Sequence, residues 1–193
     1  MVEVLVTLFI LSIGLLGVAS LQFVSAFSNA DALNRSQSLL VAQQFGERLR
    51  ASASLSATGS GLVVHNDYFK PELYNFANLS CPDGGTPEQC YCLALPATIP
   101  DCQSTLCSAA QFAVFDTYEV SCAATSANPI VKIGLSCEDN NPLDGDLCSV
   151  GSRQRIILSW PIENWQGNQG ILNPDCNVDQ PTAHACIILE PTL

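Results

Sequence analysis

An unbroken stretch of apolar and small residues opens the chain. Glu3 stands at its front, and no other charged residue occurs before Asp31. As a helix rising ~1.5 Å per residue, the stretch from Val4 to Phe27 would reach ~36 Å. The apolar core of a bilayer is ~30 Å thick. The pattern therefore predicts a single membrane span over residues 1–28, with the rest of the protein held at its end.

Two other interpretations of this stretch are less favoured. A buried core helix is disfavoured because apolar runs longer than ~18 residues are typical of membrane spans. A cleaved secretory signal is disfavoured because no basic residue precedes the run, the run is too long, and no small-residue cleavage site closes it.

The helix is predicted to continue as an amphipathic half over residues 29–54. Its polar residues include Gln37, Gln43, Gln44 and Arg48. Four apolar residues recur at i, i+3, i+6 and i+10, which places them on one helical face that should pack on the head: Leu39, Ala42, Phe45 and Leu49. Residues 51–61 are small and include two glycines, so the helix should end in this linker.

The head, residues 55–193, is predicted to combine a long connection, one helix and a small sheet. The connection spans residues 55–107 and a helix covers about 107–120, with Phe112, Phe115 and Glu119 at helical spacing. Alternating apolar and polar positions predict two strands within about 130–160, and residues 183–189 are a third strand candidate. Such alternation is typical of an antiparallel sheet with one covered face, and the long helix is the available cover. The fold class is therefore α+β.

The charge lies entirely on the head. The chain has a net charge of −11, and the first fifty residues contribute three acidic and three basic residues. An acidic head argues against nucleic-acid binding, which needs basic surface. It also argues against docking on anionic lipid.

The ten cysteines all follow residue 80, and their even number predicts disulfides and an oxidising compartment. Arg35, Arg48 and Arg50 follow the span and, taken alone, would place the head in the cytoplasm. We give the cysteines more weight. They are Cys81, Cys90, Cys92, Cys102, Cys107, Cys122, Cys137, Cys148, Cys176 and Cys186.

One disulfide can be predicted, between Cys176 and Cys186. Cys186 lies in the last predicted strand, and Cys176 follows the turn-prone Asn173-Pro174-Asp175. A hairpin-like return brings such positions within the ~4.4–6.8 Å Cα separation that a disulfide needs. The remaining pairings stay open at this point.

Signals for catalysis are weak, so a non-catalytic protein without a cofactor is expected. His65 and His184 are the only histidines, and neither has the spacing of a metal-binding helix. No nucleophile elbow, phosphate loop or dinucleotide fingerprint is present. Zinc is also disfavoured, because Cys90 and Cys92 form a C-x-C pair and no C-x2-C occurs.

A weak calcium candidate lies between Cys137 and Cys148. This segment is rich in oxygen ligands, and calcium prefers six to eight of them. It does not fit the EF-hand register, so a solvated acidic hairpin tip is the favoured interpretation. The candidate ligands are Asp139, Asn141, Asp144 and Asp146.

Glu3 has two interpretations. An acid in the first helical turn is favoured by the helix dipole and could simply sit at the lipid headgroups. A carboxylate beside a long apolar helix is otherwise costly, so Glu3 could instead neutralise a positive charge from a neighbouring subunit.

Three segments resemble one family. Met1–Leu8 and Ile10–Gly17 resemble the N-terminus of type IV pilins, most closely the PilV-type minor pilins. Residues 42–50, with Glu47, Arg48 and Arg50, resemble a second segment of those proteins. Residues 102–119 resemble a third, in which Gln111, Ala113 and Asp116 match and Tyr118 stands near the place of a tryptophan.

The resemblance implies the pilin fold, a long N-terminal helix packed on a small antiparallel sheet with a disulfide loop at residues 176–186. It implies a prepilin whose basic leader, ending in Gly, is removed and whose new N-terminus is methylated. Met1–Glu3 match the last three of the first five mature positions. Glu3 would then meet the N-terminal ammonium of a neighbouring subunit.

It further implies a location and partners. The chain would be a single-pass inner-membrane protein with a periplasmic head, and later part of an extracellular pilus. Its partners would be other minor pilins and the major pilin through the N-terminal helix, the inner-membrane assembly machinery and a tip adhesin.

Two alternatives stay open. One is a minor pseudopilin of a type II secretion system, and the other is an anchored periplasmic binding or sensor domain. Glu3 distinguishes the latter, because a plain anchor has no need of an acid at that position.

Overall fold

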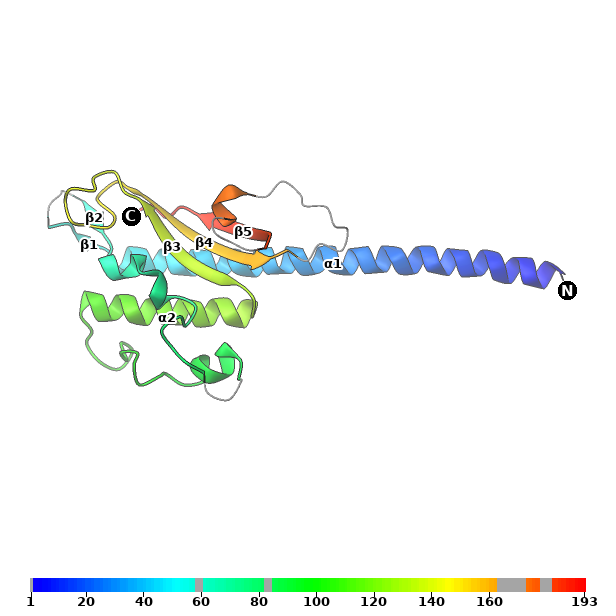
Figure 1. The fold of residues 1–193 in the computed structure, drawn as a ribbon, viewed down its shortest axis with the longest axis horizontal. Coiled ribbons are helices and arrows are strands. Elements are labelled where there is room, and N and C mark those ends of the chain that lie inside the picture. Colours follow the sequence, from blue (N-terminus) through cyan, green and yellow to red (C-terminus); the bar gives the residue numbers. More distant parts are fainter. Residues whose placement is uncertain (1, 58–60, 82–84, 163–172, 178–181) are drawn as a thin grey trace. The chain divides into compact units, whose positions relative to one another are not determined.

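In a computed structural model, which describes residues 2–57, 61–81, 85–162, 173–177 and 182–193, the chain is a mixed α+β protein (Figure 1). It divides into two compact units, Met1–Ser36 and Gln37–Leu193. The regular elements are α1 (Val2–Ser52), β1 (Ser54–Leu55), β2 (Leu62–Val63), α2 (Ala109–Ala127), β3 (Lys132–Glu138), β4 (Arg153–Pro161) and β5 (His184–Leu189).

The first unit consists of the N-terminal part of α1. Its residues 2–33 are all exposed. Their hydroxyl groups bond back to the helix itself, as Ser12 Oγ does to the carbonyl oxygen of Phe9 at 2.7 Å. Within this unit an ion pair joins Arg35 Nε to Asp31 Oδ2 at 3.0 Å, one helical turn apart.

The sheet of the second unit is antiparallel with strand order β3-β4-β5. All three predicted strands are present, and β4 confirms the predicted alternation, since every second residue of it is buried. Ile156 and Leu158 of β4 are fully buried and lie opposite Leu189 and Ile187 of β5. Ile130, predicted as strand, lies outside β3 and is exposed.

The C-terminal part of α1 covers this face of the sheet, as the alternation predicts. Val41, Ala42, Phe45 and Leu49 are buried in one core cluster with Ile156. Leu39 was wrongly assigned to this face, because its side chain is 40% exposed. At ~3.6 residues per turn, Leu39 lies about 90° away from the centre of the buried stripe, which begins with Ser38 instead.

Helix α2 begins where the sequence predicts and ends later. Ser108 Oγ accepts from the backbone N–H of Gln111 at 3.3 Å, and Gln111 Oε1 accepts from the N–H of Ser108 at 2.9 Å. This is a capping box, which satisfies two free donors at the helix start. The predicted end near residue 120 is wrong, because the buried face continues through Ser121 and Ala124 to Ala127.

The long connection before α2 holds more structure than predicted. The expected linker forms a small ladder, in which Ser54 of β1 pairs with Val63 of β2. Gly61 is required there, because a Cβ would lie 2.2 Å from Val150 Cγ1. Three short helices follow: η1 (Asn66–Phe69), η2 (Pro71–Leu73) and the π-helix η4 (Glu88–Cys92).

Asn75 fastens this connection to the sheet. Its side-chain amide donates to the carbonyl oxygen of Ile133 at 2.8 Å and accepts from the N–H of Ile133 at 2.9 Å. The amide thus takes the place of a neighbouring strand on β3. Asn75 and Phe76 have φ of 53° and 60°, a left-handed conformation that Asn tolerates and that is strained for a bulky residue such as Phe.

Candidate functional site

The N-terminal part of α1 presents a continuous apolar surface. Its length and composition are those of a membrane anchor or a signal sequence. Leu5, Phe9 and Leu16 are each more than 60% exposed. An uninterrupted apolar surface of this size is typical of a segment that lipid or other helices cover.

Glu3 lies in the first turn of α1 and is exposed. An acid at this position is stabilised by the partial positive charge of the helix N-terminus. Gly14 and Gly17 have no atom within 4 Å of where a Cβ would stand. Because these two positions carry no side chain, the backbone of a second helix could approach α1 closely there.

A buried polar cluster connects the two other segments that carry the family resemblance. Arg48 Nη1 of α1 donates to Asp116 Oδ1 of α2 at 2.7 Å, and Asp116 is fully buried. Tyr68 of η1 donates from its hydroxyl to Asp116 Oδ2, also at 2.7 Å. Glu119 Oε2 lies 3.5 Å from Arg48 Nη2.

The cluster fastens three elements at one point. Burial raises the pKa of Tyr68 well above its ordinary value, so its hydroxyl stays protonated and donates. Tyr74 donates to the carbonyl oxygen of Tyr68 at 2.6 Å, and both rings pack against Phe45. A buried carboxylate is costly unless it is paired and hydrogen-bonded, and Asp116 is both.

The cysteines form five disulfides, and none of them is free. Cys176 pairs with Cys186 at a Cα separation of 5.7 Å, which is the pairing that the sequence predicts. The turn beside it, η5 (Pro174–Cys176), carries the carboxylate of Asp175 at 3.8 Å from Arg155. The other pairs, left open by the sequence, are Cys81–Cys90, Cys92–Cys122, Cys102–Cys107 and Cys137–Cys148.

Two of these disulfides strengthen a second apolar cluster. Phe76, Tyr91 and Tyr118 are buried together, with Cys81, Cys90, Cys92 and Cys122 packed against them. The rings of Phe76 and Tyr91 stack with centroids 5.0 Å apart. The disulfides therefore hold the irregular connection against α2, where few regular hydrogen bonds are available.

Asp139 organises the acidic loop between Cys137 and Cys148 through hydrogen bonds. Asp139 Oδ1 accepts from the N–H of Ser149 and from Ser152 Oγ, both at 3.0 Å. These hydrogen bonds lower the pKa of Asp139 to about 2. Asp144 accepts from the side chain of Asn141 and from the N–H of Asp146.

Asp139 and Asp144 therefore accept hydrogen bonds from neighbours within the loop. Among the described residues, no group of three or more His, Cys, Asp or Glu side chains is arranged to hold a metal ion. The two histidines have local roles. His65 Nδ1 accepts from the N–H of Asp67 at 3.2 Å and caps η1, while His184 is buried with its Nδ1 2.7 Å from the carbonyl oxygen of Thr182.

Sequence reasoning missed the functional importance of two pairings. Arg48 and Asp116 each matched a family segment, but nothing in their local spacing indicated that they meet. Asn75 was not singled out at all. The only available signal was an asparagine at a position that needs left-handed backbone, which cannot be located without the fold.

Comparison with protein-family models, curated proteins and solved structures finds no match for this chain. The class that the structure defines is therefore an α+β protein with an apolar N-terminal helix and a disulfide-linked head.

Proposed function

We propose that the chain is a non-catalytic minor pilin. It is anchored in the inner membrane by residues 1–28 with its head in the periplasm, and it is then incorporated into a type IV pilus. Its task there is to prime assembly or to form part of the tip complex. The packing of the C-terminal part of α1 on a small antiparallel sheet supports the proposal, because the family resemblance implies this layout.

The observation that carries the proposal is the apolar helix with a single acid at its start. Between Glu3 and Asp31 no charge interrupts the surface, and residues 2–33 are exposed. Such a helix suits both environments that a pilin meets, the bilayer before assembly and a bundle of like helices afterwards. Glu3 then pairs with the N-terminal ammonium of a neighbour, after removal of a leader and methylation.

A second line of support comes from the head. Two segments resemble PilV-type minor pilins, and they contact each other through Arg48 and the buried carboxylate of Asp116. Two segments that resemble one family and also contact each other support the proposal better than either segment alone. The capping residue Gln111 belongs to the same match.

The partners follow from this function. The major pilin and other minor pilins contact the N-terminal helix, and the inner-membrane assembly machinery extracts the subunit. A tip adhesin contacts the head, for which the loop closed by Cys176 and Cys186 is a suitable surface.

A minor pseudopilin of a type II secretion system is the nearest alternative, because it needs the same helix and acid. Five disulfides favour the pilus over the pseudopilus, because a filament outside the cell benefits from covalently cross-linked subunits. An anchored sensor domain does not account for Glu3.

The test compares Glu3→Ala with Glu3→Asp in the native cell. Membrane insertion of both variants should equal that of the wild type. Incorporation of Glu3→Ala into sheared filaments should fall at least about tenfold, because two charges ~4 Å apart interact by ~4 kcal/mol at an effective dielectric constant of about 20. Glu3→Asp, which keeps the charge, should retain part of it. Wild-type incorporation of Glu3→Ala would contradict the assembly role.

A further inference from the structure

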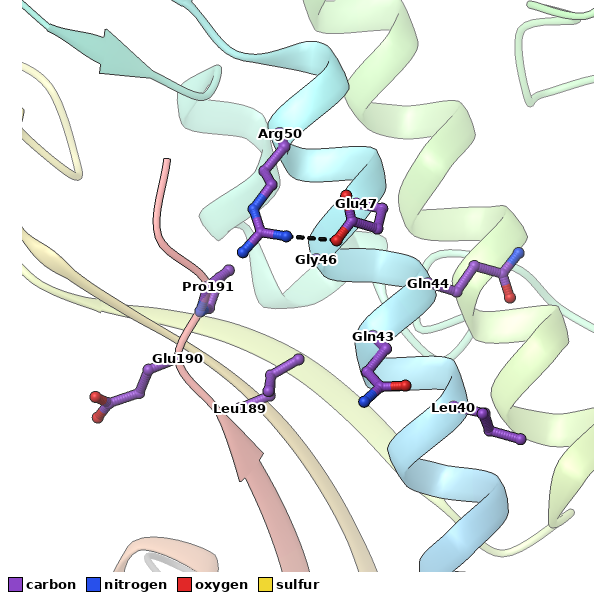
Figure 2. Close-up of a pocket in the computed structure, with 9 residues that line it drawn as sticks. All are labelled: Leu40, Gln43, Gln44, Gly46, Glu47, Arg50, Leu189, Glu190 and Pro191. Atoms are coloured by element: carbon purple, nitrogen blue, oxygen red, sulfur yellow. Dashed lines mark hydrogen bonds and ion pairs between the residues drawn. The ribbon is translucent and has the colours of Figure 1, made fainter.

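A groove of about 560 Å³ runs along the head between α1 and the chain that leaves β5 (Figure 2). One wall is a flank of α1 that carries Gln43, Glu47 and Arg50. The other wall is the segment Leu189–Pro191. Gly46 also lines the groove, and a Cβ at this position would be in ordinary van der Waals contact with Leu189 Cδ2, at 3.7 Å.

The backbone of β5 that borders this groove faces outward. The backbone N–H and C=O of His184 both point away from β4. The side chain of Asn177 donates to the carbonyl oxygen of His184 and accepts from its N–H. Backbone direction alternates along an antiparallel strand. The N–H and C=O of Ile188 therefore also point away from β4, and among the described residues no hydrogen bond to either group occurs.

This outward edge is bounded at both ends. Asn177 occupies it at His184, and the disulfide from Cys176 to Cys186 holds η5 beside it. At the far end Pro191 has no N–H, and Arg50 Nε donates to the carbonyl oxygen of Thr192 at 2.9 Å. The stretch Ile188–Pro191 is left between them, with a length of ~13 Å.

The opposite edge of the sheet is not equivalent. β3 packs against α2 and η1, and Asn75 fills the outward hydrogen-bonding positions of Ile133. An exposed edge with unused backbone groups is a template for one more strand. Of the two edges of the β3-β4-β5 sheet, the β5 edge combines unused backbone groups with a groove in the part of the chain that the structure describes.

We propose that Ile188–Pro191 is a strand-addition site that binds a free, extended tail of another polypeptide. The tail adds to β5 by backbone hydrogen bonds, which supply affinity. One of its apolar side chains lies against Leu40, Leu189 and Pro191 in the groove. The tail is neutral or basic, because the head carries the net charge of −11.

The occupant is a tail rather than the β5 edge of a second copy. The site is concave, with a flank of α1 as one wall, so two such sites cannot pair edge to edge. The inference goes beyond the proposed function and does not depend on it.

The probe is a fluorescent, acetylated peptide of eight residues with alternating Val and Thr and a Lys at each end. Its partner is the full chain in detergent micelles, and binding is followed by fluorescence anisotropy. A matched peptide carries N-methyl groups on alternate residues, which remove the donors of one edge. The expected result is at least tenfold weaker binding of the methylated peptide.

Two variants locate the site. Ile188→Pro removes the outward N–H, a change that an edge strand tolerates because the ladder to β4 is not involved. Ile188→Ala keeps the N–H and removes the side chain. Binding should fall at least tenfold in Ile188→Pro and less than threefold in Ile188→Ala.

Several outcomes overturn the proposal. They are equal binding of both peptides, equal binding to Ile188→Pro and wild type, or no binding to wild type at 1 mM peptide. Self-association that Ile188→Pro abolishes would assign the edge to a second copy instead. If Ile188→Pro does not fold, the two peptides on the wild-type chain still decide the question.

Discussion

The two parts of helix α1 have the same secondary structure but differ in burial. Residues 2–33 bury no side chain, whereas Val41, Ala42, Phe45 and Leu49 are buried further along the same helix. The first part is the more apolar of the two. Hydrophobicity alone therefore does not identify the core of this protein, and the exposed half needs a second apolar environment.

The cysteines follow the same division. All ten lie in the head, where the long irregular connection and the loops beyond the sheet have few ladder hydrogen bonds. Covalent links and buried polar pairs replace regular structure there. The exposed helix needs neither, because its hydrogen bonds are all internal.

The largest expected effect comes from separating the two parts. Removal of residues 1–28 should yield a head that stays in solution as a monomer without detergent, because the remaining helix keeps one buried stripe. Size-exclusion chromatography coupled to light scattering measures this. Persistent association of the truncated head with membranes would contradict a single span.

Within the head, Asp116→Ala should cost about 3 kcal/mol of unfolding free energy, because Arg48 and the hydroxyl of Tyr68 lose a buried partner. Glu119→Ala removes the weaker, partly exposed contact to the same guanidinium. It should cost less than ~1 kcal/mol. Urea unfolding of the truncated head gives both values. Equal losses of unfolding free energy in the two variants would show that the buried pair stabilises the head no more than the exposed contact does.

Loss of the C-terminal disulfide should be slightly less costly. The double variant Cys176→Ser with Cys186→Ser should lose roughly 2–3 kcal/mol, as expected for opening a loop of this size. Peptide mapping of the unreduced wild type should find Cys176 linked to Cys186. A peptide joining Cys176 to any cysteine before residue 150 would refute both the pairing and this end of the fold.

The parts of the fold that the sequence predicts are those with a local pattern. β3 and β4 follow from alternation, and Cys176–Cys186 follows from a short turn between neighbouring cysteines. Helix α2 was placed too short, because Ser121, Ala124 and Thr125 are small residues that give little periodic signal although they are buried.

The site residues that the sequence does not predict depend on distant partners. Arg48 and Asp116 are 68 residues apart, and Asn75 contacts a strand that begins 57 residues later in the chain. Leu39 was misplaced for a different reason. Leu39 and Ser38 both fit a helical repeat, and hydrophobicity favoured the residue that the fold leaves exposed.

The smallest expected effect concerns the acidic loop. Hydrogen bonds lower the pKa of Asp139 to about 2 in the folded loop, against an ordinary value of ~3.9. Their stabilisation is therefore complete above about pH 4 and is lost as the pH falls toward 2. The protection factor of the Ser149 amide, obtained by NMR as its intrinsic exchange rate divided by its observed rate, should fall over this range. Asp139→Asn should abolish the transition, and an unchanged profile in that variant would assign it to another group.

The central claim is that the exposed helix carries the chain from a membrane into a filament. Mass spectrometry of filaments sheared from the native cell, compared with the inner-membrane fraction, tests it most directly. The account predicts the chain in both fractions, with residues 4–28 intact in the filament. Recovery of the chain only from the membrane, or only as a soluble head without those residues, would contradict it.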